Sequence, residues 1–273
     1  MTLEEWLAAA RRRCPELLPL ELRLLISQAT GLSRAQQYGH GEALPPAALA
    51  TLEANLRRLE GGEPLAYVLG HWEFFDFSLK VSPATLIPRS DTEVLVEAAL
   101  ERLPVNRAAD VIDLGTGSGA IALALARHRP RARLLAIDNS AAALAVAEEN
   151  ARALGLDNVR FLQNSWLDGL AGRAADLIVS NPPYIDPADE HLPALRHEPR
   201  SALVAGEQGF ADLWAIVDTA PAVLRPGGWL LLEHGFEQGA AVRHRLESRG
   251  WERVETRRDR AGRERVSGGC WPG

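Results

Sequence analysis

The stretch ADVIDLGTGSGAIALALARHRPRARLLAID, residues 109–138, decides the fold. Its two ends, ADVIDL and RLLAID, are short apolar runs typical of buried strands, and residues 119–128 between them carry a helical pattern. A glycine-rich loop follows the first strand, where glycine permits a tight turn and lets backbone N–H groups come close to a ligand. Strands that alternate with helices predict a mostly parallel sheet covered on both faces.

The same alternation continues along the chain. We expect a helix at 140–154, strands at VRFLQ and ADLIVS, a helix at 207–223 and a strand at GWLLLEH. Another helix and a strand pair near WERVET and RERVSGG complete the pattern. The fold class is therefore predicted to be α/β, with a helical N-terminal addition.

The first part of the chain, residues 1–62, reads as a small domain of short helices. LEEWLAAARR places Leu3, Trp6 and Leu7 on one face, and Gly31 is expected to end the second helix. A third helix is expected in PPAALATLEANLRRLEGG, between its prolines and its glycines. Such a domain can bind a partner or cover a surface.

Residues 63–88 form a linker of different character. LAYVLGHWEFFDFSLKV mixes aromatic residues with partial alternation, which predicts a strand pair. The third part, residues 89–273, is expected to open with a helix near Ser90, whose hydroxyl and Glu93 would form a capping box. A surface ion pair between Arg89 and Glu93 is the alternative.

Composition narrows the possible functions. The net charge is −6, whereas proteins that bind along a phosphate backbone usually carry an excess of basic residues. Residues 243–265 are locally basic, with nine arginines and five acidic residues. No stretch approaches the roughly 20 apolar residues that span a bilayer. The first residues place acids before arginines, unlike a secretory signal, and two cysteines are too few for a disulfide scaffold. We therefore expect a cytoplasmic protein without a membrane or direct nucleic-acid partner.

The glycine loop and the acid of the next strand predict an adenosine cofactor. Asp138 ends that strand roughly 20 residues beyond the glycines, where an acid can bond a ribose hydroxyl. The loop also fits a loose dinucleotide fingerprint. Two features favour S-adenosylmethionine: the spacing Gly115-x-Gly117-x-Gly119, and Asp113, whose carboxylate would oppose a pyrophosphate but attract an ammonium group. The alternative interpretation is that Asp113 has only a structural role, as a cap of the strand end.

A second motif, SNPPYIDPAD at residues 180–189, follows the strand ADLIVS. The Asn181 side-chain oxygen and the Pro182 carbonyl would be two acceptors held close together by the rigid Asn181-Pro182-Pro183-Tyr184 corner. A planar –NH2 group could donate both hydrogens to them while its nitrogen faces a methyl donor. Tyr184 would offer a flat surface for a planar amide or base. The catalytic candidates are therefore Asn181 and Pro182.

With these motifs the chain resembles the class I, Rossmann-like methyltransferases that act on planar amino groups. GEPLAYVLGHWEF, SPATLIPRSDTEVLVE, NSW, NPPYIDPAD, RHEPRSAL and LLLEHG narrow the resemblance to the release factor glutamine methyltransferases, the PrmC or HemK family. The resemblance implies methylation of the glutamine amide in the Gly-Gly-Gln motif of class I peptide-chain release factors. It implies cofactor binding by Gly115, Thr116, Gly117, Ser118, Gly119, Asp138, Trp166 and Asn181, and substrate binding by Asn181 through Tyr184.

The sequence is also compatible with three other functions. A ribosomal-protein glutamine methyltransferase would share the corner, a nucleic-acid amino methyltransferase would stack a base on Tyr184, and a non-catalytic module would only bind the cofactor. His234 is expected to be structural, and His197 and Glu198 to brace the loop after the corner. No cluster has metal-ligand spacing.

Overall fold

The computed structural model describes residues 1–273, and the chain divides into two compact units, Met1–His71 and Trp72–Gly273. The first unit is helical. Its helices are α1 (Leu3–Arg13), α2 (Pro19–Thr30), α3 (Arg34–Gln37), α4 (Pro46–Glu60) and α5 (Leu65–Leu69). None of the helices combines the length and the apolar composition that a membrane-spanning helix needs.

The ends of these helices follow local sequence. In α1, Thr2 and Glu5 form a capping box, and the face predicted to be apolar is buried. As predicted, α2 ends at Gly31, which has φ 73° and donates its N–H to the Ser27 carbonyl. The predicted third helix is confirmed as α4, which ends at Gly61.

The prediction of strand for LAYVL was wrong, because this segment is the helix α5. All five residues, Leu65–Leu69, are buried, so the segment lacks the alternating exposure of a half-covered strand. Gly70 ends the helix with φ 77°. Gln28 donates to the Leu69 carbonyl at 2.9 Å and Arg58 to the Tyr67 carbonyl at 3.0 Å, so distant side chains satisfy its last turn. The strand pair is confirmed only beyond it, as β1 (His71–Phe74) and β2 (Phe77–Lys80).

The second unit is built on a seven-stranded sheet in the order β5-β4-β3-β6-β7-β9-β8. The strands are β3 (Asp110–Leu114), β4 (Arg133–Asp138), β5 (Val159–Gln163), β6 (Ala175–Ser180), β7 (Leu224–Glu233), β8 (Glu252–Arg258) and β9 (Glu264–Cys270). The first five are parallel, and β9 runs antiparallel between β7 and β8. The strand order reverses between β3 and β6, where ligands bind at the carboxyl ends of an open α/β sheet.

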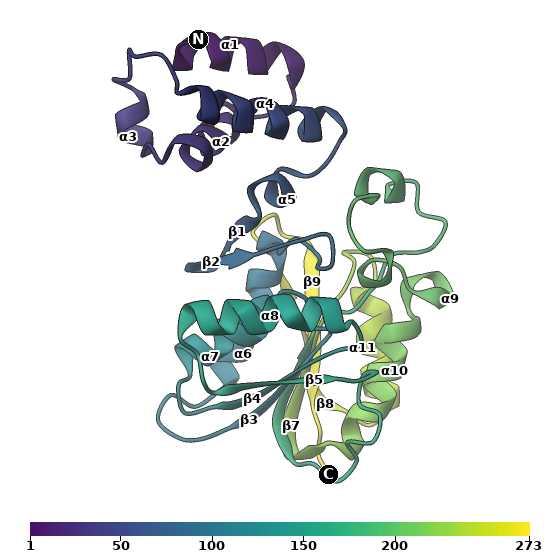
Figure 1. Ribbon diagram of the computed structural model, residues 1–273. Helices are drawn as coiled ribbons and strands as arrows, with labels where there is room; N and C mark the ends of the chain where they lie inside the picture. Colours follow the sequence, from purple (N-terminus) through teal and green to yellow (C-terminus); the bar gives the residue numbers. More distant parts are fainter. The chain divides into compact units, whose positions relative to one another are not determined.

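Helices cover both faces of the sheet, as predicted (Figure 1). One face packs against α6 (Glu93–Arg102), α7 (Ala120–His128) and α8 (Ala141–Leu154), and the other against α10 (Ala211–Thr219) and α11 (Gly239–Ser248). Alternation along β3 sends Val111 into the first core and Ile112 into the second. The double burial explains why these strands read as continuous apolar runs.

Two helix starts differ from the prediction. A 3₁₀ turn at Ser90–Thr92 precedes α6, and the helix makes no side-chain cap, so the Ser90–Glu93 capping box was wrong. Glu93 instead accepts from the Phe75 N–H at 3.3 Å, and Arg89 pairs with Glu198. These partners are distant in sequence and outcompete the local cap.

The helix predicted at 207–223 is interrupted. It consists of α9 (Gly206–Gly209), α10 and a 3₁₀ turn at Ala220–Ala222. Glu207 and Gln208 have left-handed φ values of 52° and 58°, which break the helix before α10 begins.

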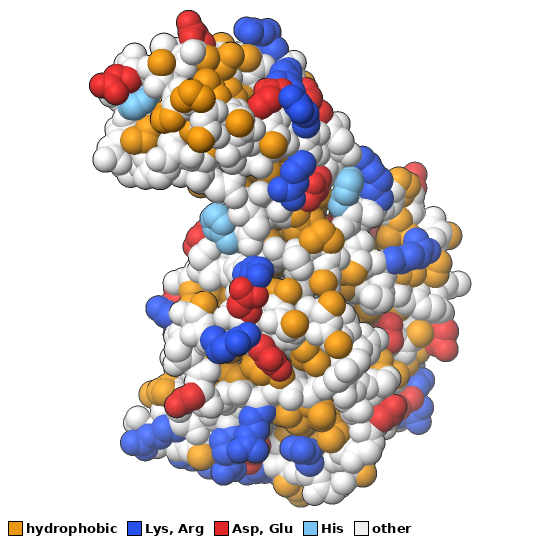
Figure 2. Space-filling view, viewed as in Figure 1, with side chains coloured by type: hydrophobic (Ala, Val, Ile, Leu, Met, Phe, Trp, Pro, Cys, Tyr) orange, Lys and Arg blue, Asp and Glu red, His pale blue; other side chains and the backbone are white.

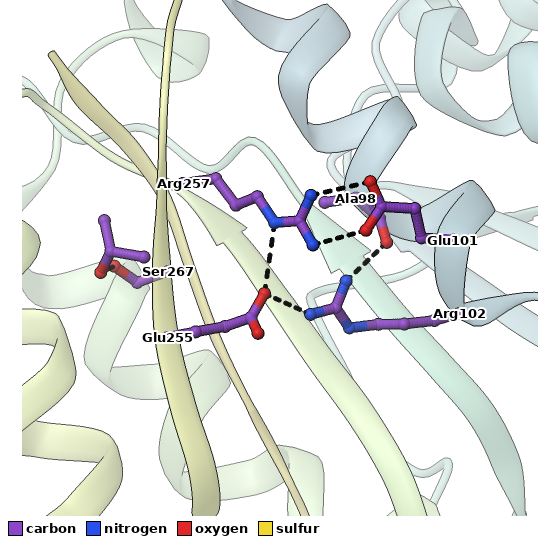
Figure 3. Close-up of polar contacts among 7 residues, drawn as sticks. Ala98, Glu101, Arg102, Glu255, Arg257 and Ser267 are labelled. Carbon is purple, nitrogen blue, oxygen red and sulfur yellow. Dashed lines mark hydrogen bonds and ion pairs between the residues drawn. The ribbon is translucent and has the colours of Figure 1, made fainter. Parts of the chain in front are cut away.

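Within the arginine-rich segment 243–265, Arg257 belongs to a network of ion pairs with α6. Arg257 binds Glu101 of α6 at 2.8 Å and Glu255 at 3.3 Å, and Arg102 of α6 also binds Glu255 (Figure 3). Arg102 lies over the Trp229 ring, 4.1 Å from its centroid. This network fastens α6 to the outer strands of the sheet, so Arg257 has a structural role.

Candidate active site at the carboxyl edge of the sheet

A cavity of about 320 Å³ opens at the carboxyl ends of β3, β4, β5 and β6. Its wall includes predicted site residues from four separate loops: Gly115, Thr116, Gly117, Ser118, Asp138, Trp166, Asn181 and Pro183. Thr92 and Asp212, which the sequence did not single out, also line it. Gly119, Pro182, Asp113 and Tyr184 are not part of this wall.

The glycine loop crosses from β3 to α7 in a conformation that needs glycine. Gly115, Gly117 and Gly119 have φ values of 70°, 57° and 87°. The N–H groups of Gly115 and Thr116 both donate to the Ile137 carbonyl of β4, which holds the loop against the neighbouring strand. Gly119 precedes α7, and a Cβ there would lie 2.9 Å from Leu123 Cδ1. The loop therefore keeps its backbone at the cavity wall.

Asp138 connects this loop to the end of β4. Its Oδ2 accepts from the Gly117 N–H at 2.9 Å, and its Oδ1 accepts from the Ser140 N–H at 2.9 Å. A carboxylate oxygen has a second lone pair, so both oxygens can still accept from hydroxyl groups in the cavity. This geometry suits the two hydroxyls of a ribose.

Asp113 lies outside the cavity wall and is fully buried. Its Oδ2 accepts from the Thr116 hydroxyl at 2.7 Å and the Ala122 N–H at 3.1 Å, while Oδ1 has no partner. Burial raises the pKa of Asp113 to about 7. A side chain without exposed surface cannot reach an ammonium group directly, so the structure supports the capping role of Asp113.

Trp166 forms a flat part of the cavity wall. Its backbone is left-handed, with φ 43°, and its indole N–H donates to Asp212 at 3.2 Å. The ring lies 3.5 Å from where a Cβ on Gly115 would stand, so the indole packs on the glycine loop. Asp212 comes from the start of α10 and fixes the indole, a contact between residues 46 positions apart.

The Asn181-Pro182-Pro183-Tyr184 corner follows β6. Ser180 donates its hydroxyl to the Leu114 carbonyl at 2.7 Å, which ties the corner to the end of β3. Asn181 donates its side-chain N–H to the Thr92 hydroxyl at 3.2 Å. The Tyr184 carbonyl accepts from Gln238 at 3.2 Å. Contacts from three other segments therefore fix this short turn.

Tyr184 faces a second cavity, of about 560 Å³. That cavity is lined by Trp72, Glu73, Phe74, Pro88, Arg89, Ser90, Asp91, Glu93, Tyr184, Glu233 and Arg265. The Tyr184 hydroxyl donates to Glu233 at 3.4 Å, and burial raises the pKa of the phenol. The corner thus presents Asn181 and Pro183 to one cavity and Tyr184 to the other.

Neighbouring polar residues have structural roles. Glu198 accepts from the Ile87 N–H at 3.0 Å and pairs with Arg89, so it braces the loop after the corner as predicted. The buried His234 contacts the Gly235 carbonyl and the Ser267 hydroxyl, each at 2.8 Å, and burial lowers its pKa. No group of three or more His, Cys, Asp or Glu residues is placed to hold a metal.

The strand order, and the glycine loop, Asp138 and Trp166 at one cavity, fit an adenosine-containing cofactor. In a comparison with family models, residues 91–198 match the methyltransferase small domain, and residues 5–70 match the PrmC N-terminal domain. The fold and the family match together place the protein in the class of S-adenosylmethionine-dependent methyltransferases of class I.

The chain belongs to the release factor glutamine methyltransferase family. It is 48% identical over 276 residues to the release factor glutamine methyltransferase of Yersinia pestis, with 99% of each chain covered. It is 44% identical to that of Escherichia coli K12, with 98% of each chain covered. The protein is therefore an enzyme that uses S-adenosylmethionine.

Solved structures of lower identity share the fold. A methyltransferase from Pyrococcus furiosus has a TM-score of 0.55 at 16% identity and covers 81% of this chain and 99% of its own. An S-adenosylmethionine-dependent O-methyltransferase from Thermotoga maritima has a TM-score of 0.52 at 16% identity. The alignment covers 72% of this chain and 73% of the Thermotoga chain.

Proposed function

We propose that this enzyme transfers a methyl group to the side-chain amide nitrogen of the glutamine in the Gly-Gly-Gln motif of class I peptide-chain release factors. The observation that carries the proposal is the Asn-Pro-Pro-Tyr corner, which contributes Asn181 and Pro183 to the wall of the cavity. The names of its relatives, which are release factor glutamine methyltransferases, support the substrate.

The corner suits a weak nucleophile. An amide nitrogen has a delocalised lone pair, so catalysis has to come mainly from positioning and from acceptors that favour the transition state. Asn181 Oδ1 and the Pro182 carbonyl would accept the two N–H groups of the glutamine amide. S-adenosylmethionine supplies the electrophilic methyl group when bound, and its thioether leaving group needs no acid.

In this proposal the cofactor is held by residues 115–119, Asp138, Trp166 and Asn181. Asp138 would accept from the ribose hydroxyls with the lone pairs that Gly117 and Ser140 leave free. The Trp166 indole would lie against the adenine. Asp113 would act indirectly, because it bonds Thr116 and Ala122 rather than the cavity.

The helical unit is proposed to bind the protein substrate. It exposes large apolar side chains: Leu18 is 62% exposed, Leu20 44% and Tyr38 71%. Apolar side chains mark a protein contact where they gather into a contiguous patch, and these three are the candidates for such a contact on this unit. The cytoplasmic location expected from the sequence fits such a substrate and remains a prediction.

A nucleic-acid substrate receives no support from the surface. Basic side chains lie among acidic ones over most of the face in Figure 2. In the arginine-rich segment, Arg245 and Arg249 share Asp218, and Arg265 pairs with Asp91 and Asp259. Phosphate binding would have to displace these internal partners.

The test is mass spectrometry of a release factor after incubation with the enzyme and S-adenosylmethionine. We expect one added methyl group on the motif glutamine and none on a release factor carrying Gln→Ala there. A ribosomal protein assayed alongside separates the two glutamine substrates. If the control release factor gains the same methyl group, or neither gains any, the proposed acceptor is wrong.

A further inference from the structure

Ser118 lies in the glycine loop at the wall of the cofactor cavity, between Gly117 and Gly119, which are both left-handed. Glycines on both sides leave the Ser118 backbone free to turn, because a glycine has many accessible conformations. Ser118 is 3% exposed, and its N–H bonds to no group of the protein, so this donor is available to the cofactor. Contacts from outside the loop are therefore needed to hold the residue in place.

The Ser118 carbonyl does not join the helix that follows it. In a continuing helix this carbonyl would accept from the N–H group four residues further on, which belongs to Ala122. Ala122 instead donates to Asp113 at 3.1 Å, and the left-handed Gly119, with φ 87°, turns the chain before α7 begins. A buried carbonyl group without a partner is costly, so its donor has to come from another element.

Asn150 of α8 supplies that donor. It is 3% exposed, and its Nδ2 donates to the Ser118 carbonyl at 2.9 Å. Nδ2 also donates to the Lys80 carbonyl at 3.0 Å, while Oδ1 accepts from the Lys80 N–H at 2.7 Å. A backbone N–H can only donate and a carbonyl can only accept, so the two Lys80 contacts fix the orientation of the amide. The amide nitrogen is therefore always directed at Ser118.

Two side chains hold the loop on either side of one peptide group. Asp138 accepts from the Gly117 N–H at 2.9 Å, and Asn150 donates to the Ser118 carbonyl. The peptide group that joins Gly117 to Ser118 lies between these two contacts, and it carries the Ser118 N–H that no protein group accepts. Without Asn150 the loop would keep only the contact on the Gly117 side, and the glycines would let this N–H turn.

We propose that Asn150 is a positioning residue for cofactor binding. It fastens the glycine loop to the end of β2 and so keeps the Ser118 N–H available to S-adenosylmethionine. The hairpin to which β2 belongs also lines the cavity of Tyr184, through Trp72, Glu73 and Phe74. One amide therefore joins the wall of the cofactor cavity to the hairpin beside the corner. The inference concerns the cofactor alone and does not depend on the proposed methyl acceptor.

Asn150→Leu and Asn158→Leu provide a matched test. Leucine resembles asparagine in size and branching but forms no hydrogen bond, so each variant leaves backbone groups unpaired. Asn158 stands just before β5, away from the carboxyl edge of the sheet. Its Nδ2 lies 3.2, 3.4 and 3.2 Å from the carbonyl oxygens of Ala126, Arg129 and Ala132. The control therefore also removes an amide that bridges backbone carbonyls, but without touching the glycine loop.

Affinity for S-adenosylhomocysteine is measured by calorimetry. We expect it to fall about 10-fold or more in Asn150→Leu, the loss expected from one buried carbonyl left unpaired, and to stay within about twofold in Asn158→Leu. In cofactor-free protein, hydrogen exchange of residues 115–119, followed by mass spectrometry, should be faster in Asn150→Leu alone. In the methyltransfer assay the KM for S-adenosylmethionine should rise more than kcat falls, because the loop positions the cofactor.

Wild-type affinity or wild-type loop exchange in Asn150→Leu would overturn the proposal, as would equal losses of affinity in the two variants. If Asn150→Leu does not fold, Asn150→Asp replaces it, with Asn158→Asp as the control. Asn150→Asp keeps the acceptor for the Lys80 N–H and puts an oxygen in place of the donor to Ser118, so cofactor affinity should again fall in this variant alone. Wild-type affinity in Asn150→Asp would refute the role of the donor. Binding and exchange are measured without a release factor, so their outcome leaves the proposed acceptor untouched.

Discussion

Gly209 offers the sharpest test of how the corner is held in place. It has φ 88°, and a Cβ at this position would stand 2.2 Å from the Tyr184 carbonyl oxygen. Real Cβ atoms essentially never come closer than 3.0 Å, so Gly209→Ala must push the two backbones apart by at least about 0.8 Å. The Tyr184 carbonyl also accepts from Gln238, and that contact would be disturbed.

A displacement on this scale should be visible in the rate. A misplacement of about 1 Å can cost on the order of 100-fold in catalysis. We therefore expect Gly209→Ala to lower kcat by roughly 10- to 100-fold. A left-handed alanine should also lower the free energy of unfolding by about 1–2 kcal/mol.

Gly250→Ala is the matched control. Gly250 has a similar φ of 83°, but a Cβ there meets nothing within 4 Å, so it carries the backbone strain without the collision. Steady-state kinetics on the release factor and urea unfolding should be measured for both variants. We expect a larger loss of stability in Gly209→Ala, because the collision adds to the strain, and a loss of kcat in Gly209→Ala alone. Equal kcat in the two variants would show that Gly209, and not the corner, moves to relieve the contact.

Three further predictions concern single side chains. Asn181→Ala should abolish methyl transfer while cofactor affinity, measured by calorimetry, stays within severalfold; near-full activity would remove the residue from catalysis. Asp138→Ala should weaken cofactor binding because charge-assisted bonds to the ribose are lost, and unchanged titration heats would contradict this assignment. The pKa of Glu233 is raised from 4.5 to about 7 by burial, so the folded state holds this proton more tightly than the unfolded chain. The free energy of unfolding should therefore fall as pH rises from about 4.5 to 7, and less so in Glu233→Gln; identical pH slopes in urea unfolding would refute the shift.

Most strands of the second unit could be predicted from the sequence. They are buried on both faces of the sheet, so each appears as a continuous run of apolar residues. The run RLLAID gave β4 with its observed bounds, Arg133–Asp138, and the glycine loop and Asp138 lie at one cavity as expected. The spacing of apolar residues and of glycines involves only residues close together in the chain, so it can be recognised in a single sequence. The same reasoning failed at LAYVL, where burial on all sides removes the alternation that separates strand from helix.

The missed features depend on partners far apart in the chain. Thr92 and Asn181 are 89 positions apart, and Gln238 reaches Tyr184 across 54 positions. The interruption at Glu207 and Gln208 brings Gly209 against the Tyr184 carbonyl. No local pattern marks such contacts, because each partner alone is an ordinary polar or small residue. The motif residues were therefore visible in the sequence, while the residues that orient them were not.

The corner is proposed to hold a glutamine amide for methylation. The most direct measurement is mass spectrometry of a class I release factor treated with wild-type enzyme and, in parallel, with Asn181→Ala. We expect one added methyl group on the Gly-Gly-Gln glutamine with wild-type enzyme and none with the variant. An unmodified glutamine with cofactor-bound wild-type enzyme, or equal methylation by both proteins, would contradict this proposal.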